Sequence, residues 1–344
     1  MMTSLQRLTD TAAGKPTDRI PVFCNLLDQG ARELGMSLKE YYSKGEYVAE
    51  GQLRMRERYG YDNVWALFYV GREAELMGCR KIIFANDGAP NVGEMVIKSY
   101  DDIRKLQIPD SIEEHPAFEE PLKCLKILNS EVRGKYPICA YLTASMTLPA
   151  MLMGIEKWME LLFNGPKEVA DELLTKCSEF FQKQIAAYRK AGVDLILYTN
   201  AFGSPDFVPM KFFHQRSMPW MKRDLAPGGV EDIAYMCASA GMNPVIDSVY
   251  NELNIKAFHL GPLDDVSEAS RIIDGRALCI GVINDVKMID WSKDQVKDEV
   301  KRIIEAGKPR GRFMLSTQVM PYAIPDENIK AMMDAAFEFG QFQQ

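Results

Sequence analysis

Short apolar runs alternate along the chain with longer stretches whose apolar residues recur at helical spacing. Eight runs have strand length: Ile20–Cys24, Asn63–Tyr69, Ile138–Leu142, Leu195–Thr199, Asp232–Cys237, Lys256–Leu260, Ala277–Ile283 and Arg312–Ser316. Most are continuously apolar, as strands covered on both faces must be. Eight such strands, each followed by a helix, predict an α/β protein with a closed (β/α)8 TIM barrel.

Helix signals between these runs support the same reading. Lys167–Ala191 carries apolar residues at helical spacing, and Gly192 is placed to end the helix in a left-handed turn. Ser292 and Gln295 have the spacing of a capping box, and Gly307 follows the last turn of that helix. Repeated strand–helix units therefore fit most of the chain.

One segment interrupts the repeat. Cys79–Ile97 reads as a β-hairpin around the turn residues 86–88, and we expect it to be an insertion in the main fold. No linker, low-complexity tract or charge block divides the chain. We therefore expect a single domain over residues 1–344.

The amino-acid composition limits the kinds of molecule that this protein is expected to bind. The formal net charge is −7 over 344 residues, and no basic stripe exists to neutralise nucleic-acid phosphates. The seven cysteines are odd in number and include no C-x-x-C pair, which favours a reducing compartment. No apolar run has the form of a signal peptide or the length of a bilayer span. We expect a cytoplasmic protein with small-molecule or protein partners, and neither nucleic acid nor membrane.

Four separated segments resemble the uroporphyrinogen decarboxylase superfamily, and within it the corrinoid-dependent methyltransferases that act on methanol, methylamines, halomethanes, thiols or aryl methyl ethers. They are DRIPVFCNLLDQGARELGMSLKEYY, TASMTLPAMLMGIEKWMELLFNGPKEVADELL, AGVDLILYTNAFGS and FMLSTQVMPYAIPDENIKAMMDAA. The resemblance implies a barrel of the uroporphyrinogen decarboxylase type with its reacting groups at the carboxyl ends of the strands.

The decarboxylase branch fits these residues poorly. Its members carry arginines after the first strand that hold the carboxylates of a tetrapyrrole, whereas Leu26–Arg32 holds only one arginine. The family's aspartate that contacts the pyrrole nitrogens falls here near Phe68 or Tyr69. Tetrapyrrole decarboxylation is therefore the less favoured activity.

The zinc motif of the methyltransferase branch is also incomplete. Its H-x-C position reads Cys237-Ala238-Ser239, and its later cysteine falls near Val319. A thiolate-zinc site needs three such ligands, so we do not expect a conventional one. Cys237 remains a candidate ligand or a small core residue. The departure of the aryl-ether branch from H-x-C keeps Asp247, Glu252 or His259 as alternative ligands.

Demethylation of an ether requires an acid for the departing oxygen. Three catalytic candidates arise: His259 and Tyr198 close strands at the expected barrel mouth, and Asp247 follows an apolar run. An imidazole suits proton transfer near neutral pH. The alternatives are a hydrogen-bonded wall residue, a polar rim and a helix N-cap, respectively.

Further polar residues after strands are expected to bind substrate: Asn25, Asp28, Arg32, Tyr69, Asn200, Gln318 and Tyr322. Methionines near strand ends predict an adaptable apolar pocket that suits a methoxylated or aromatic ligand. The resemblance then implies methyl transfer between this substrate and a corrinoid (cobalamin) carried by a partner protein. The alternative is a barrel that binds a small molecule without turning it over.

Overall fold

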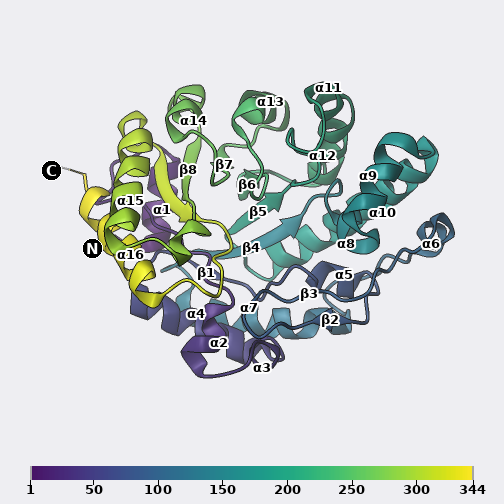
Figure 1. Ribbon diagram of the computed structural model, residues 1–344, viewed down its shortest axis with the longest axis horizontal. Coiled ribbons are helices and arrows are strands. Elements are labelled where there is room, and N and C mark those ends of the chain that lie inside the picture. The colour runs from purple at the N-terminus through teal and green to yellow at the C-terminus, as the bar shows by residue number, and fades with distance from the viewer. Residues whose placement is uncertain (1, 343–344) are drawn as a thin grey trace.

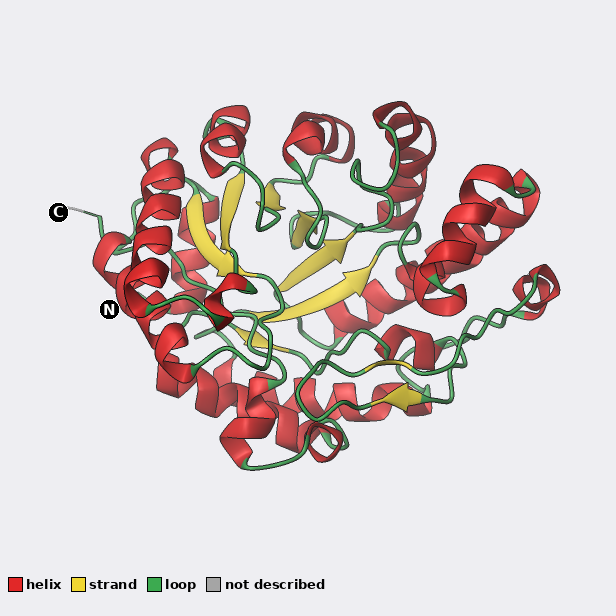
Figure 2. Cartoon of the chain, in the orientation of Figure 1, coloured by secondary structure: helices red, strands yellow, loops and turns green. Residues whose placement is uncertain are grey.

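The computed structural model describes residues 2–342 and shows a curled parallel sheet with helices around it (Figure 1, Figure 2). The strands follow one another in the order β1-β4-β5-β6-β7-β8-β9 and all neighbouring pairs are parallel. Their bounds are β1 (Val64–Trp65), β4 (Ile138–Thr143), β5 (Leu195–Thr199), β6 (Ile233–Met236), β7 (Ala257–His259), β8 (Leu278–Ile283) and β9 (Phe313–Thr317). The predicted α/β class and parallel sheet are confirmed.

Most of the longer helices surround the curled sheet (Figure 2). The helices of the described residues are α1 (Ser4–Ala12), α2 (Gln29–Leu34), α3 (Leu38–Tyr41), α4 (Gly45–Tyr59), α5 (Arg72–Leu76), α6 (Tyr100–Lys105), α7 (Glu119–Val132), α8 (Leu148–Met153), α9 (Ile155–Asn164), α10 (Lys167–Lys190), α11 (Met210–Phe212), α12 (Met218–Leu225), α13 (Ile246–Leu253), α14 (Val266–Ile273), α15 (Lys293–Gly307) and α16 (Asp326–Phe339).

Local signals in the sequence set these elements. Every residue of β4 and β8 is buried, which accounts for their unbroken apolar character. After α10, Gly192 has a φ of +87°, the left-handed conformation expected of a helix terminator. At the start of α15, Ser292 and Gln295 form both hydrogen bonds of a capping box.

The first predicted strand is not a regular strand. Ile20–Cys24 makes one isolated bridge with β9, between Val22 and Leu315, and the Phe23 N–H donates to the Leu315 carbonyl at 2.9 Å. On its other side, one backbone bond remains, from the Asp62 N–H to the Val22 carbonyl at 2.8 Å, while side chains accept the other bonds: the N–H of Val22 donates to Asp62 and that of Cys24 to Asn63. The sheet among the described residues therefore has seven strands, and the expectation of eight regular strands was wrong for this reason.

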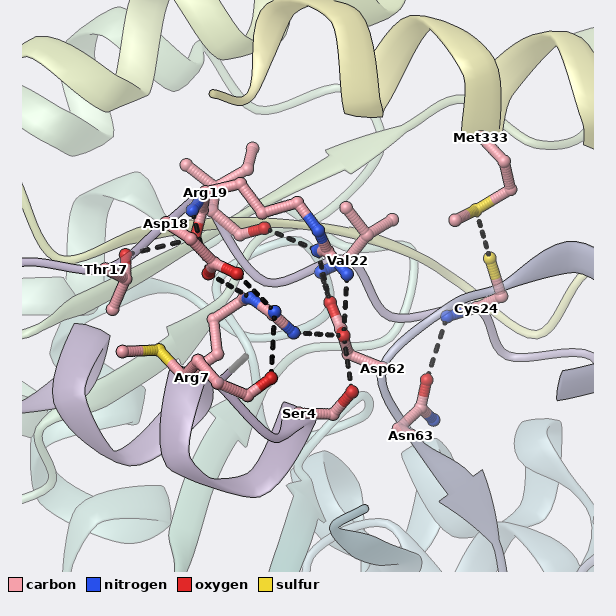
Figure 3. A network of polar contacts seen from close by, with 12 residues as sticks. Ser4, Arg7, Thr17, Asp18, Arg19, Val22, Cys24, Asp62, Asn63 and Met333 are labelled. Atoms are coloured by element: carbon pink, nitrogen blue, oxygen red, sulfur yellow. Dashed lines mark hydrogen bonds and ion pairs between the residues drawn. The ribbon is translucent and has the colours of Figure 1, made fainter. Parts of the chain in front are cut away.

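Asp62 is the centre of a buried ion-pair cluster that holds this segment (Figure 3). Its carboxylate is 2.8 Å from Arg7 Nη1 and 2.6 Å from Arg19 Nη1. The Ser4 hydroxyl donates to the same carboxylate at 2.6 Å. Helix α1, which carries Ser4 and Arg7, is thereby fixed to the segment before β1.

The segment predicted as a hairpin contains a short antiparallel pair outside the main sheet, β2 (Ile82–Ile83) and β3 (Asn91–Val92). Figure 1 shows this pair beside α5 and α7, away from the barrel strands. No helix in residues 2–342 has both the length and the apolar character needed to cross a membrane.

Candidate functional site

A parallel sheet brings the carboxyl ends of all its strands to one edge, and polar side chains meet there. His259, the last residue of β7, is buried, and its Nε2 lies 3.1 Å from the hydroxyl of Ser316 on β9. Because β8 separates β7 from β9, this contact spans the width of β8.

The contact continues into a chain of hydrogen bonds across the barrel. The Ser316 hydroxyl donates to the Thr317 carbonyl, which also accepts a 2.6 Å bond from the Asn25 amide. That same Asn25 amide nitrogen donates to the Tyr141 hydroxyl of β4 at 2.6 Å. We call His259, Ser316, Thr317, Asn25 and Tyr141 the Asn25 network. It joins β7, β9, the segment after Cys24 and β4.

A second group lies at the ends of β5 and β6. The amide of Asn200 and the thiol of Cys237 both contact the Tyr235 hydroxyl, at 3.2 and 3.5 Å. The Tyr198 hydroxyl donates to the Asp224 carboxyl group at 2.7 Å. We call these five residues the Tyr235 group, since the Tyr198 and Tyr235 rings are also 6.2 Å apart.

Buried polar atoms without a hydrogen-bond partner occur in several parts of the described residues, and five of them belong to the two groups above or to Asp285. They are His259 Nδ1, Asn25 Oδ1, Asn200 Oδ1, Asp224 Oδ1 and Asp285 Oδ2. Nearly all buried polar atoms in proteins are paired, so unpaired ones gathered at strand ends are candidates for contact with a ligand. Sequence reasoning found three of these residues and missed Asp224 and Asp285.

Burial makes the site largely uncharged near neutral pH. It lowers the pKa of His259 to about 4 and raises the pKa of Cys237 to about 12. The pKa of Tyr198 lies well above its usual value because of burial and the nearby Asp224. His259 was expected to act as an acid near neutral pH, and its burial lowers the pKa that such a role would use. Its catalytic role stays a prediction.

The remaining candidates for substrate binding lie in three different parts of the protein. Gln318 belongs beside the Asn25 network, because the Thr317 hydroxyl donates to its carbonyl. Asp28 and Tyr69 lie in a buried cluster with Tyr42 between them: the Tyr42 hydroxyl donates to Asp28 at 2.6 Å and its ring meets that of Tyr69. Burial raises the pKa of Asp28.

Arg32 and Tyr322 lie together at the edge of the protein. Arg32 is largely exposed, donates to the Tyr322 carbonyl at 3.1 Å and forms an ion pair with Asp326. The guanidinium is thereby held between the loop after β9, which carries Tyr322, and Asp326 at the start of α16. This placement does not bring Arg32 to the buried groups of the site.

Asp247 and Glu252 lie on the outer helix α13 and are exposed. Asp247 forms an ion pair with Arg276 at 2.8 Å, and Glu252 forms one with Lys222 at 2.7 Å. The structure does not place either residue with His259 or Cys237, since they belong to the solvent-facing surface of the helix. Within residues 2–342, no three His, Cys, Asp or Glu side chains are grouped as metal ligands would be.

Sequence reasoning missed six residues of the site: Tyr141, Asp224, Tyr235, Asp285, Ser316 and Thr317. Two of them carried a readable signal, since Tyr141 and Tyr235 place hydroxyl groups inside otherwise apolar strands. Asp285 follows the apolar run of β8, at the position where such barrels place reacting groups. Asp224 had no local signal, because its partner Tyr198 is 26 residues away.

The backbone after β6 adopts an uncommon conformation. Ala238, which follows Cys237, has a φ of +53°. This region is unfavourable for residues with a side chain, and such strain is concentrated at functional sites. It lies beside the Tyr235 group and supports the assignment of this end of the barrel.

Comparison with known proteins places this geometry in context. The family model described as uroporphyrinogen decarboxylase (URO-D) matches residues 3–339. Among solved structures, a methyltransferase from Methanosarcina mazei superimposes with a TM-score of 0.84 at 20% identity, covering 98% of this chain and 99% of that one. A search of curated proteins finds no match.

Two B12-independent methionine synthases are more distant in structure. The protein from Shewanella sp. W3-18-1, in complex with selenomethionine, has a TM-score of 0.54 at 14% identity and 88% coverage of both chains. A putative one from Listeria monocytogenes has a TM-score of 0.52 at 13% identity, covering 93% of this chain and 96% of that one. At such identities these likenesses establish the fold alone.

Proposed function

The chain belongs to the uroporphyrinogen decarboxylase family, and from this premise we propose that it is a methyltransferase. The proposed reaction moves a methyl group between a small uncharged substrate and a corrinoid carried by a separate protein. The fold shared with the Methanosarcina mazei methyltransferase supports this choice within the family. The set of unpaired buried polar atoms at the carboxyl ends of the strands is the observation that carries it.

The character of these atoms indicates the kind of substrate. Asn25 and Asn200 present neutral amide oxygens, and His259 is uncharged at neutral pH because of its burial. Such groups hydrogen-bond a neutral hydroxyl, ether or amine, whereas they supply no charge to neutralise a carboxylate. This supports a neutral methyl donor over a tetrapyrrole that bears many carboxylates, which cationic side chains would have to pair.

A largely apolar hollow supports a methoxylated or aromatic substrate. It has a volume of about 500 Å³, lies between β3, α8 and the loop after β5, and is lined by Met95, Met151, Met153 and Phe202 among others. It shares no lining residue with the Asn25 network or the Tyr235 group and adjoins the latter only through Phe202, two residues after Asn200. Methionine side chains adapt to irregular apolar ligands, and aromatic rings gain from contact with sulfur and with Phe202. The cavity is of a size that suits a small molecule.

Exposed apolar side chains around the barrel mouth support docking of a partner protein. Phe207, Leu263 and Val286 follow β5, β7 and β8, and they are 42%, 79% and 61% exposed. Apolar groups at the centre of a surface favour protein association because their burial is favourable. A corrinoid carried to this mouth would supply the nucleophilic cobalt that accepts the methyl group.

The chain's own contribution is positioning. The Asn25 network would hold the heteroatom of the substrate through Asn25 and His259, and the Tyr235 group would orient the other side of the substrate through Asn200. Holding two reactants in a reactive geometry is among the largest contributions available to an enzyme. Tyr198, engaged with Asp224, would fix the wall of the site. The side chains do not fit a thiolate-zinc site, since Cys237 has no companion ligands grouped with it among residues 2–342.

The proposal is tested with free cob(I)alamin as acceptor. Purified protein is mixed with it and with methanol or methyl aryl ethers in turn, and the loss of the cob(I)alamin absorbance is followed. We expect transfer from at least one donor, and a rate lowered at least tenfold in Asn25→Ala and Asn200→Ala. Asp247→Asn, on the outer helix, is the matched control and should react like the parent.

Two outcomes would contradict the proposal. Binding of a donor, measured by calorimetry, without transfer under any condition would favour a barrel that only binds its ligand. Release of carbon dioxide from uroporphyrinogen by this protein would restore the decarboxylase alternative.

A further inference from the structure

Asp285 occupies a position that the proposed function has not yet used. It follows β8 by two residues, is 2% exposed, and its Oδ2 has no hydrogen-bond partner among the described residues. A carboxyl group is rarely buried in this way without a partner, because burial penalises its charged form. The group therefore requires an explanation in terms of function.

The groups that interact electrostatically with Asp285 belong to the Asn25 network or adjoin it. Backbone N–H groups of Val286, on its own loop, and of Gln318, which follows β9, act to lower the pKa of Asp285. The charge of Asp285 in turn helps to raise the pKa of Tyr141 of β4. The Tyr141 hydroxyl accepts a hydrogen bond from Asn25, so Asp285 is linked electrostatically to a member of this network.

The other candidates for an acid are less suitable. His259 has no acidic proton at neutral pH, for the reason given above. The Tyr198 hydroxyl already donates to Asp224. Asp247 is on the surface and paired with Arg276.

We propose that Asp285 is the general acid that protonates the leaving atom of the methyl donor, an inference that rests on the proposed methyl transfer. The methyl–oxygen bond of an ether or alcohol breaks, and its electron pair stays on the oxygen. That oxygen takes the proton of Asp285 and departs as a neutral phenol or alcohol. The electron pair of the new bond to the methyl group comes from the cobalt(I) corrinoid, and water returns a proton to the Asp285 carboxylate.

The protonation of Asp285 agrees with this role. Burial raises its pKa to about 7, although backbone N–H groups, including those of Val286 and Gln318, act in the opposite direction. An acid of this strength is partly protonated near neutral pH and donates effectively there. No cation is needed to explain it.

The test compares two ethers of similar shape in Asp285→Asn and the parent, with free cob(I)alamin as acceptor. Methyl phenyl ether needs a proton on its leaving oxygen, whereas methyl 4-nitrophenyl ether releases a stabilised phenolate. We expect Asp285→Asn to lose about 10²- to 10⁴-fold in rate with the first donor. The rate with the nitro ether should stay within about threefold. Asp290→Asn, an exposed aspartate of the same loop, is the control and should change neither rate.

The outcomes separate this inference from the proposed function. An equal loss with both ethers, or no loss with either, overturns the role of Asp285 while leaving methyl transfer intact. If the parent protein transfers a methyl group from no donor, the proposed function fails and takes this inference with it.

A measurement without any variant or turnover keeps the inference testable if Asp285→Asn does not fold. Difference infrared spectroscopy of the parent protein between pH 5 and 9 should show a buried carboxylic acid that ionises near pH 7. In the folded Asp285→Asn variant this band should be missing. A parent protein whose buried carboxyl groups are all ionised at pH 5 overturns the proposal.

Discussion

The imidazole of His259 and the hydroxyl of Ser316 are 3.1 Å apart although β8 lies between their strands. The contact therefore spans β8 and holds the ring where it is buried from water. The imidazole is neutral in this setting, and its Nδ1 is free to bond a ligand. His259 is better described as a hydrogen-bonding residue of the site than as its acid.

This burial predicts a loss of stability in acid. The pKa of His259 falls from 6.5 to about 4 on folding, so the unfolded chain takes up a proton that the folded protein refuses. The free energy of unfolding should fall by about 3 kcal/mol as the pH drops from 6.5 to 4. In His259→Asn this part of the pH dependence should be missing, as measured by urea unfolding. His214→Asn, an exposed position, controls for the loss of an imidazole, and an identical pH dependence in parent and His259→Asn would contradict the prediction.

Asp285 predicts the opposite dependence. Its pKa rises from 3.8 to about 7 on folding, so the folded protein holds a proton that the unfolded chain has lost. Its stabilising contribution is complete below pH 3.8 and is lost as the pH rises to about 7. The loss should amount to roughly 4 kcal/mol, and Asp285→Asn should be more stable than the parent above pH 7. Equal stability of the two proteins at pH 8, in thermal or urea unfolding, would show that the carboxyl group is not buried.

The ion-pair cluster of Asp62 should be essential to stability (Figure 3). Asp62→Ala leaves the buried Arg7 with one carboxylate partner fewer and removes the acceptor that holds Val22. We expect a loss of about 3–5 kcal/mol in the free energy of unfolding. Asp326→Ala, which breaks only exposed pairs, should cost about 1 kcal/mol or less. Similar losses in the two variants would mean that the Asp62 cluster does not hold this end of the barrel.

The metal content is a separate prediction. Glu252 lies on the outer helix, and no group of three His, Cys, Asp or Glu side chains accompanies Cys237 in residues 2–342, so the companion ligands of a zinc site are lacking there. We expect well below one zinc per chain in protein purified without added metal. Elemental analysis measures this directly. One tightly held zinc that is lost in Cys237→Ala would overturn the prediction.

Local signals in the sequence accounted for most of the fold. Strand β8 lies within Ala277–Ile283 and α15 begins after Ser292, because continuous apolar runs and capping residues act over a few neighbouring positions. The sequence also indicated the family, because several separated segments resemble it in the same order. The family model that matches residues 3–339 confirms that resemblance. Methyl transfer and the corrinoid partner stay proposals.

The tertiary structure decided how the sheet closes and which groups carry charge. No local pattern shows that the side chains of Asp62 and Asn63 take hydrogen bonds that a strand would otherwise provide to Val22 and Cys24. The protonation state of His259 likewise depends on burial by residues that are distant in the chain. Its contact Ser316, for example, is 57 positions away. The sequence by itself determined the order of the elements because periodicity is local. The site emerged only when folding brought the strand ends together and excluded water from them.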